Sequence, residues 1–442
     1  MTTQLDHTHD PGRRSWVGSA NAPDTDFPLQ NLPLGVGPSA AGGHSTLLVA
    51  IGDEVLDAGA AARAGLLVGV AGELAATTGG PDRLNPVLAA AADDRAALRH
   101  ALAALLERGS RAEEPVRTAP GMLRPAAEVP LELPTRIGSY TDFYAGIHHA
   151  RAVSKILVPG GDVGPNYRWV PIAYQSRAST VRTGGAPVRR PAGQLKRPDA
   201  DPVFAPCEKL DFELELGFYV GPPTELGWPV PIGRAADHIA GYCLLNDWSA
   251  RDIQGWEMAP LGPFLSKSFA TTVSPWVVTP DALAPFRVPV MTREPGDPAP
   301  LPYLSDADDQ AAGGIAIALT VWIRTAVMRA ASQNPVQLLS SDARHLYWTP
   351  AQMLAHHTSG GCDLQSGDLL GSGTISGPRP EQLGSLIELC DDGRRPATLL
   401  NGEGRSFLAD GDEIIFTGRC AREGFVPIGF GACSGIIVET EG

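Results

Sequence analysis

The sequence predicts a protein that is mostly β with some helix, an α+β fold, and two observations support this prediction. The 442 residues include 50 glycines and 40 prolines. That density is typical of short strands joined by many turns, and it disfavours a helical bundle. Short apolar runs bounded by turn residues recur along the chain, whereas long helical patterns are few.

The N-terminal part of the chain is predicted to form a smaller unit. Residues 1–45 are rich in Pro, Gly and Asn, and we expect them to be loop. The runs 47–51 and 54–56 flank Gly52-Asp53, which predicts a strand, a turn and a second strand. Ala, Leu and Arg recur at helical spacing in residues 83–108, so we expect one or two helices there.

A second and larger unit follows. The proline-containing stretch 115–134 predicts a linker, and we place the boundary near Leu133, which divides the chain into units 1–133 and 134–442. The second unit is predicted to be mostly β with some helix. Its strand signals lie at residues 213–220, 239–245, 315–323 and 413–416.

Charge and cysteine content exclude several classes of protein. The formal net charge of -14 argues against binding to nucleic acid or to an anionic membrane. No apolar run approaches the roughly 18 residues of a membrane span, and no apolar stretch follows Arg13-Arg14 as in an export signal. We therefore expect a cytoplasmic protein. The six cysteines are scattered, so we expect reduced, mostly packed thiols and no zinc site among them.

Three acidic side chains are expected on one face of a strand. Asp211, Glu213 and Glu215 alternate with apolar residues, so they point to the same side. Clustered carboxylates repel one another and are costly unless they are solvated or bind a cation. The pattern alone favours the exposed face of an edge strand, and a cation site would need further oxygen ligands.

Two more segments carry candidate polar groups. Asp247 follows the apolar run 242–245, so it is expected at the end of a buried strand, either as a ligand or as the start of a helix. Asp142 precedes His149 by seven residues, which on one helix places an acid and a possible base on the same face. The pattern alone favours a capping acid and a surface histidine. The glycine-rich run 367–377 is not expected to bind nucleotide, because prolines follow where a phosphate-binding helix would start.

Taken together, these segments resemble the fumarylacetoacetase family over nearly the whole chain. The matching stretches are residues 26–33, 139–144, 188–194, 210–215, 245–257, 260–278, 366–378 and 429–435. The resemblance implies a small SH3-like β-barrel domain, then a larger mixed β-roll domain, usually in a homodimer. It also implies a hydrolase that cleaves a carbon–carbon bond in a 1,3-diketone acid.

The same resemblance implies roles for individual residues. The ligands of a Mg²⁺ or Ca²⁺ ion would be Asp142, Glu213, Glu215 and Asp247. His149 would be the general base, supported by Glu388. The residues that stabilise the oxyanion and the leaving carbanion would be Lys267, Gln254 and Arg251. The substrate contacts would be Tyr144, Tyr174, Val158, Met258 and Thr374.

Two departures from the family leave the substrate open. Val158 stands where the family usually has Arg, and Met258 where it usually has Tyr, and both usual residues contact substrate carboxylates. Hydrolysis of fumarylacetoacetate is one interpretation, and a related enzyme for a less acidic or bulkier acyl chain is another. The wider superfamily also contains decarboxylases, isomerases and hydratases of enolisable oxo compounds. A binding protein that kept the fold is a third interpretation, and the complete set of catalytic residues argues against it.

Overall fold

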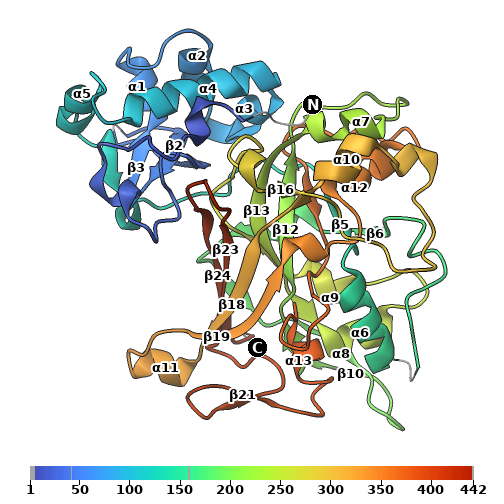
Figure 1. The fold of residues 1–442 in the computed structure, drawn as a ribbon. Coiled ribbons are helices and arrows are strands. Elements are labelled where there is room, and N and C mark those ends of the chain that lie inside the picture. Colours follow the sequence, from blue (N-terminus) through green and yellow to red (C-terminus); the bar gives the residue numbers. More distant parts are fainter. Residues whose placement is uncertain (1–4, 41, 158–159, 441–442) are drawn as a thin grey trace.

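A computed structural model describes residues 5–40, 42–157 and 160–440. The predicted substrate contact Val158 lies outside these residues. The chain forms a smaller N-terminal unit, blue in Figure 1, and a larger unit rich in strands. Helices and strands occur in both units, so the predicted α+β class is confirmed.

The N-terminal unit is a four-stranded antiparallel sheet with helices packed against it (Figure 1). The strands, in sheet order, are β1 (Leu34–Pro38), β2 (Ser45–Ile51), β3 (Glu54–Asp57) and β4 (Leu123–Pro125). The helices are α1 (Ala58–Arg63), α2 (Gly69–Thr77), α3 (Asn85–Ala89), α4 (Ala92–Leu106) and α5 (Glu113–Thr118). The predicted strands at 47–51 and 54–56 and the predicted helices within 83–108 are thus confirmed. The SH3-like barrel stays a prediction.

Two segments of this unit differ from the sequence-based expectation. Strand β1 lies in the stretch predicted to be loop, where Gly35 and Gly37 interrupt the apolar pattern. A Cβ at Gly35 would lie 2.6 Å from the ring of Trp276, so close packing explains that glycine. Helix α5 and strand β4 occupy much of the stretch predicted to be a linker, because β4 completes the sheet beside β3.

A seven-stranded sheet is the centre of the larger unit. Its strands, in order, are β6 (Ala173–Gln175), β5 (Tyr140–Phe143), β20 (Leu369–Gly371), β12 (Leu214–Val220), β13 (Ile239–Asp247), β15 (Thr271–Val273) and β7 (Val181–Thr183). Every residue of β12 and β13 is buried, because both faces of this part of the sheet are covered. Tyr219, Cys243 and Leu245 pack with the apolar core of the N-terminal unit.

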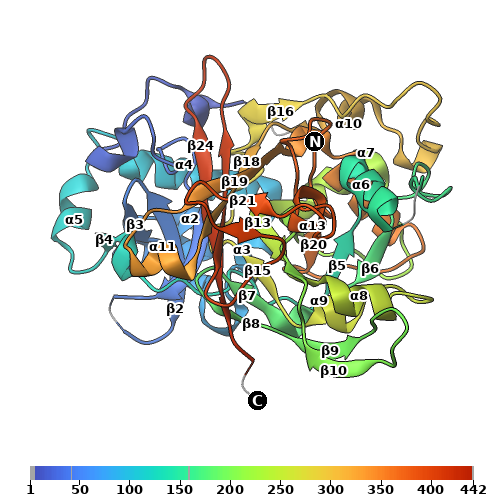
Figure 2. The same cartoon turned by 90° about the horizontal axis from the view of Figure 1, so that it is seen from below.

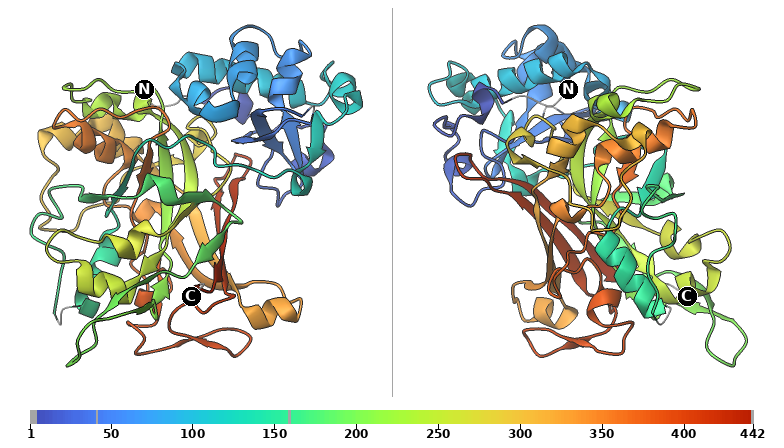
Figure 3. Two further views of the ribbon diagram at one scale, coloured as in Figure 1. Left: turned by 180° about the vertical axis from the view of Figure 1, so that it is seen from behind. Right: turned by 45° about the vertical axis from the view of Figure 1, so that its right-hand side comes forward.

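A five-stranded sheet packs on the other face. Its order is β19 (Val336–Asp342), β18 (Ala318–Arg324), β23 (Glu413–Cys420), β24 (Ile428–Val438) and β8 (Pro187–Arg189). The rings of Phe212 and Phe416 meet in the shared core, 5.7 Å apart between centroids. The hairpin of β23 and β24 reaches the N-terminal unit (Figures 1 and 3), where Asn31 Nδ2 donates to the carbonyl of Gly429.

Short helices lie beside the lower ends of the strands at the lower right of Figure 1, and Figure 2 shows them from below. They are α6 (Ile147–Leu157), α8 (Arg251–Glu257), α9 (Leu265–Ser268) and α13 (Leu386–Leu389). The remaining helices are α7 (Ile232–Ala235), α10 (Ala307–Ala312), α11 (Ala326–Ala330) and α12 (Pro350–Thr358). The remaining strands are β9 (Ala192–Leu195), β10 (Val203–Pro206), β11 (Leu210–Asp211), β14 (Ser249–Ala250), β16 (Arg287–Val288), β17 (Gly314–Ile315), β21 (Ala397–Thr398) and β22 (Gly404–Arg405). None of the helices in the described part of the chain has the length and apolar character needed to cross a bilayer.

Candidate active site

Three buried carboxylates meet on the seven-stranded sheet. Asp142 lies on β5, Glu215 on β12, and Asp247 is the last residue of β13. Their ligand oxygens lie within 4.8 Å of one another. Strand β20 runs between β5 and β12 and presents Gly371 beside Asp142. A Cβ at Gly371 would lie 2.4 Å from Asp142 Oδ1 and 3.1 Å from Glu215 Oε2, so the glycine leaves space between the carboxylates.

The electrostatics of this cluster favour a cation. Burial, with the nearby charge of Asp247, raises the pKa of Asp142 to about 8, and burial also raises the pKa values of Glu215 and Asp247. The hydroxyl of Tyr140 donates to Asp142 Oδ2 at 2.8 Å, and that of Tyr174 lies 2.5 Å from Asp247 Oδ2. Asp142 Oδ1 is buried and receives no hydrogen bond within the described residues. An all-oxygen donor set with a free buried oxygen fits Mg²⁺ or Ca²⁺.

Glu213 lies beside this cluster but has other partners. It falls in the break between β11 and β12, where Lys267 Nζ lies 2.5 Å from Oε2 and Arg251 Nη1 lies 2.7 Å from Oε1. Burial opposes its ionisation, but the charges of Lys267 and Arg251 outweigh burial and lower the pKa of Glu213. Lys267 also contacts Asp247 Oδ2 at 2.8 Å. Lys267 therefore connects Glu213 to the three-carboxylate cluster.

A buried histidine and glutamate form a second group. His149 on α6 lies with Nδ1 2.8 Å from Oε2 of Glu388 on α13. The hydroxyls of Ser376 and Ser385 donate to the same carboxylate at 2.9 and 2.7 Å. His149 Nε2 lies 3.8 Å from Glu213 Oε1. If Nδ1 donates to Glu388, Nε2 has a free lone pair on the side of the ring that faces Glu213.

Several residues of the site were not assigned a role from the sequence. Asp211 is fully buried; it accepts from Arg251 Nε at 2.9 Å and from the backbone N–H groups of Leu386 and Ile387 at 2.7 and 3.1 Å. Asp211 thus holds both Arg251 and the start of the helix that carries Glu388. The sequence analysis placed Asp211 on one strand face with Glu213 and Glu215. In the structure the strand is interrupted, because β11 ends at Asp211 and β12 begins at Leu214. Ser376 and Ser385 carry no pattern that would have revealed them.

Two sequence-based expectations about these residues were wrong. Asp142 and His149 do not share a helix, because Asp142 lies on β5 and only His149 lies on α6. The strand with Glu213 and Glu215 is not an exposed edge, because β12 is the central strand of its sheet. Packing on both faces of this sheet buries the carboxylates. The alternation of acidic and apolar residues in the sequence does not show whether the acidic face is covered.

The polar groups proposed to act on substrate lie around the same site. Gln254 Oε1 on α8 accepts from Arg251 Nη1 at 3.2 Å. The ring of Tyr144 stands perpendicular to that of His149, with centroids 5.7 Å apart. Tyr174 contacts the carboxylate cluster directly.

The remaining predicted substrate contacts differ in exposure. Thr374 follows β20 and is buried, and its hydroxyl has no hydrogen-bond partner within the described residues. Met258 lies at the C-terminal end of α8 and is 44% exposed.

Comparisons with known proteins agree with the resemblance seen in the sequence. The family described as "Fumarylacetoacetase N-terminal" matches residues 30–134, and "Fumarylacetoacetate (FAA) hydrolase C-terminal" matches residues 139–435. The chain is 43% identical to fumarylacetoacetase of Bos taurus and 42% identical to that of Arabidopsis thaliana. Each alignment covers 94% of this chain and 97% of the relative.

Among solved structures, fumarylacetoacetate hydrolase from Exiguobacterium antarcticum aligns with a TM-score of 0.49 and 15% identity, over 92% of this chain and 100% of that chain. Two family matches that together span most of the sequence, and relatives above 40% identity over nearly its full length, establish its membership. The chain therefore belongs to the fumarylacetoacetase family.

Proposed function

We propose that this protein is a metal-dependent hydrolase that cleaves a carbon–carbon bond in fumarylacetoacetate or a closely similar 1,3-diketone acid. The observation that carries the proposal is the placement of the His149–Glu388 pair beside the buried carboxylates, with His149 Nε2 3.8 Å from Glu213. A base and a group of buried carboxylates that could hold a cation are thereby adjacent. The relatives from Bos taurus, Arabidopsis thaliana and Homo sapiens are each named fumarylacetoacetase, which supports the choice of substrate.

In the proposed mechanism His149 acts as the general base. Its Nε2 accepts a proton from a water molecule, whose oxygen attacks the carbonyl carbon. Glu388 fixes the tautomer of His149 and stabilises the imidazolium that forms. The carbon–carbon bond then breaks, its electron pair passes to the departing carbon, and the imidazolium returns a proton there. The products are a carboxylic acid and a shorter oxo acid.

The charged groups around His149 stabilise the negative charge of the reaction. Asp142, Glu215 and Asp247 would hold the cation, which supplies electrophilic polarisation of the dioxo unit when bound. We propose Mg²⁺ or Ca²⁺, since hard oxygen ligands suit both. Lys267 and Arg251 place fixed positive charge next to the carboxylates, where an oxyanion or enolate would develop.

The place of Glu213 among the ligands is part of the proposal. The resemblance makes it a fourth ligand, whereas its oxygens here contact Lys267 and Arg251. A carboxylate has enough acceptor positions to keep one cationic partner and bind an ion as well. Metal analysis of the Glu213→Gln variant decides between a ligand and a positioning residue.

A shifted substrate preference is the second candidate. Val158 and Met258 replace residues that usually bind substrate carboxylates, and they offer apolar volume in place of a charge and a hydroxyl. A carboxylate left unpaired in the pocket would be poorly stabilised, so an apolar or larger acyl end is favoured. The chemistry at the dioxo unit would be unchanged.

One experiment tests both candidates. Fumarylacetoacetate and an uncharged acyl analogue are incubated with the Mg²⁺-saturated protein, and the products are analysed side by side. Two acid products from either compound support the hydrolase. Absence of cleavage of both compounds contradicts it. The shifted preference is tested by kcat/KM for fumarylacetoacetate in the native protein and in a Val158→Arg/Met258→Tyr variant. If the native value is typical of the family and the variant does not differ from it, the shifted preference is contradicted.

Wider features of the proposal rest on the resemblance. They are a homodimeric assembly, a place in tyrosine breakdown and a cytoplasmic location. Light scattering of the purified protein tests the first, since a monomer at micromolar concentration would contradict it.

A further inference from the structure

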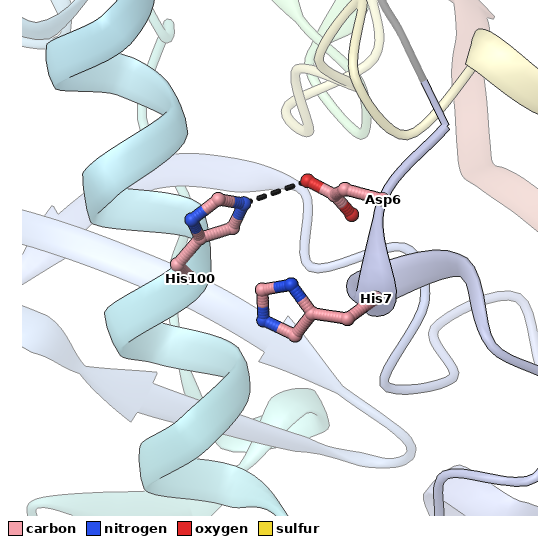
Figure 4. Close-up of side chains that lie close together, drawn as sticks. All are labelled: Asp6, His7 and His100. Atoms are coloured by element: carbon pink, nitrogen blue, oxygen red, sulfur yellow. Dashed lines mark hydrogen bonds and ion pairs between the residues drawn. The ribbon is translucent and has the colours of Figure 1, made fainter.

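A second group of metal-ligating side chains lies in the N-terminal unit, separate from the carboxylate cluster. Asp6 and His7 lie at the short helix η1 (His7–His9), and His100 lies on α4. One potential ligand atom from each side chain lies within 4.8 Å of the other two. Figure 4 shows the two imidazole rings and the carboxylate grouped together.

The geometry of the three groups is close to that of a metal site. Asp6 Oδ2 lies 2.6 Å from His100 Nε2, and the rings of His7 and His100 have centroids 4.7 Å apart. Ligands about 2.1 Å from a tetrahedral ion stand roughly 3.4 Å apart, so modest side-chain rotation suffices. Asp6 and His7 are exposed, which leaves space for water ligands and for that rotation.

The carboxylate of Asp6 is oriented by its neighbours. Its Oδ1 accepts from the backbone N–H and the hydroxyl of Thr8 at 2.8 and 2.6 Å. Arg99 Nε in turn donates to that hydroxyl at 2.9 Å. Oδ1 is therefore occupied, and Oδ2 is directed at His100. Such outer partners are a regular feature of sites in which a carboxylate binds a metal.

The segment that carries Asp6 and His7 is itself anchored. His9 Nδ1 accepts from the backbone N–H of Asp6 at 3.0 Å, which completes a capping box, and His9 Nε2 lies 2.8 Å from the carbonyl of Asp281. The backbone at η1 is thus fixed against both units. Two ligands from η1 and one from α4 would be bridged by a single ion.

We propose that Asp6, His7 and His100 bind a borderline divalent transition-metal ion of the Zn²⁺ class, which links the N-terminal segment to α4. Two imidazoles and a carboxylate suit such ions, whereas the oxygen-only cluster of the active site suits Mg²⁺ or Ca²⁺. The two sites therefore differ in the metal they select. The ion has a structural role here, and the proposal is independent of the activity proposed above.

Zinc titration of the Mg²⁺-saturated protein tests the proposal by isothermal calorimetry. The native chain, His100→Ala and His7→Gln are compared with His44→Ala, which removes an exposed histidine elsewhere in the N-terminal unit. We expect one Zn²⁺ in the native chain and in His44→Ala that binds at least about tenfold more weakly in the other two variants. Zn²⁺ that binds to the carboxylate cluster would contribute the same signal in all four proteins. The test is therefore the difference in Zn²⁺ binding between the proteins.

Co²⁺ provides an independent signal, because visible absorption reports nitrogen and oxygen coordination. We expect a visible absorption band of bound Co²⁺ in the native chain and no such band in His100→Ala. The turnover of His100→Ala should equal that of the native chain. Equal Zn²⁺ binding by the native chain, His100→Ala and His7→Gln would show that Asp6 and His100 form only a hydrogen-bonded cap, and would overturn the proposal. His7→Gln preserves the contact of Asp6 with His100, so it remains informative if His100→Ala fails to fold.

Discussion

His149 is placed so that its two ring nitrogens have different partners. Nδ1 faces Glu388, whose carboxylate is also held by Ser376 and Ser385, and Nε2 faces Glu213. The adjacent His148 packs on the ring of His345. Two neighbouring histidines therefore have different expected roles, and the neighbour provides a matched control.

Replacing His149 by Ala should lower kcat by about 10²–10⁴-fold, because the proton acceptor is lost. Metal content and the circular dichroism spectrum should stay those of the native protein. The same substitution at His148 should leave kcat within about twofold of native, since this half-buried ring contacts His345 and not Glu388. Similar rates for the two variants would assign the base to another residue.

Substitution of Glu213 and of Glu215 should affect Mg²⁺ affinity differently. Glu215→Gln should weaken Mg²⁺ binding by more than the roughly 10–100-fold typical of an outer partner, because it removes a ligand. Glu225→Gln, at an exposed acid, is the control. Glu213→Gln should also destabilise the fold by about 3–5 kcal/mol, because it breaks a buried contact with Lys267 and Arg251. Full metal occupancy in Glu213→Gln would restrict the ligands to the other three carboxylates.

At the scale of elements, β20 determines how closely the carboxylates approach. Gly371 pairs with Asp142 on one side and with Gly217 of β12 on the other. Any side chain at that position would enter the space between Asp142 and Glu215. A three-residue strand thus sets the size of the proposed metal pocket.

Gly371→Ala should therefore weaken Mg²⁺ binding by about tenfold or more and destabilise the fold by about 1–3 kcal/mol, because its Cβ would lie 2.4 Å from Asp142 Oδ1. Gly404→Ala is the control, since Gly404 lies on β22 with open space around its Cβ position. Calorimetry with Mg²⁺ and thermal unfolding measure the two effects. Native Mg²⁺ affinity in Gly371→Ala would show that the pocket is wider than the structure indicates.

The sequence predicted where strands begin and end more reliably than it predicted which side chains are buried. Asp247 was expected at the end of a buried strand, and β13 ends there, because a long apolar run followed by an acid is a strong local signal. The burial of Glu215 could not be predicted, since it depends on β20 and on the N-terminal unit, which are far away in the chain. Strand β4 was missed because its three residues form a strand only beside β3.

At the scale of the whole molecule, the carboxylate cluster affects stability. The pKa of Asp142 rises from 3.8 to about 8 on folding, chiefly through burial, and those of Glu215 and Asp247 rise as well. A raised acid pKa means that the folded state binds protons more tightly than the unfolded state. Without a cation, the contribution of these three groups to stability is therefore greatest at low pH and falls as pH rises from about 4 to about 8.

In EDTA, the contribution of these carboxylates should lower Tm as pH rises through that window, and saturating Mg²⁺ should reduce the slope. The cation neutralises the ionised carboxylates, so Mg²⁺ affinity should rise with pH over the same range. Thermal unfolding of the native chain and of Asp142→Asn in both buffers checks this. The variant lacks one titrating group, so its slope in EDTA should be shallower; an equal slope would contradict the assignment.

The pairing of β8 with β24 has a consequence for biosynthesis. Pro187 lies opposite Ile436 in this parallel pair, so an edge strand pairs with a strand that the ribosome adds 249 residues later (436 − 187). At typical rates of chain elongation, β8 waits roughly 10–50 s for that partner. Glu388, too, emerges long after His149 has been made. A nascent chain therefore carries an unpaired strand until β24 has been made, and premature termination before β24 yields a fragment that is prone to aggregate.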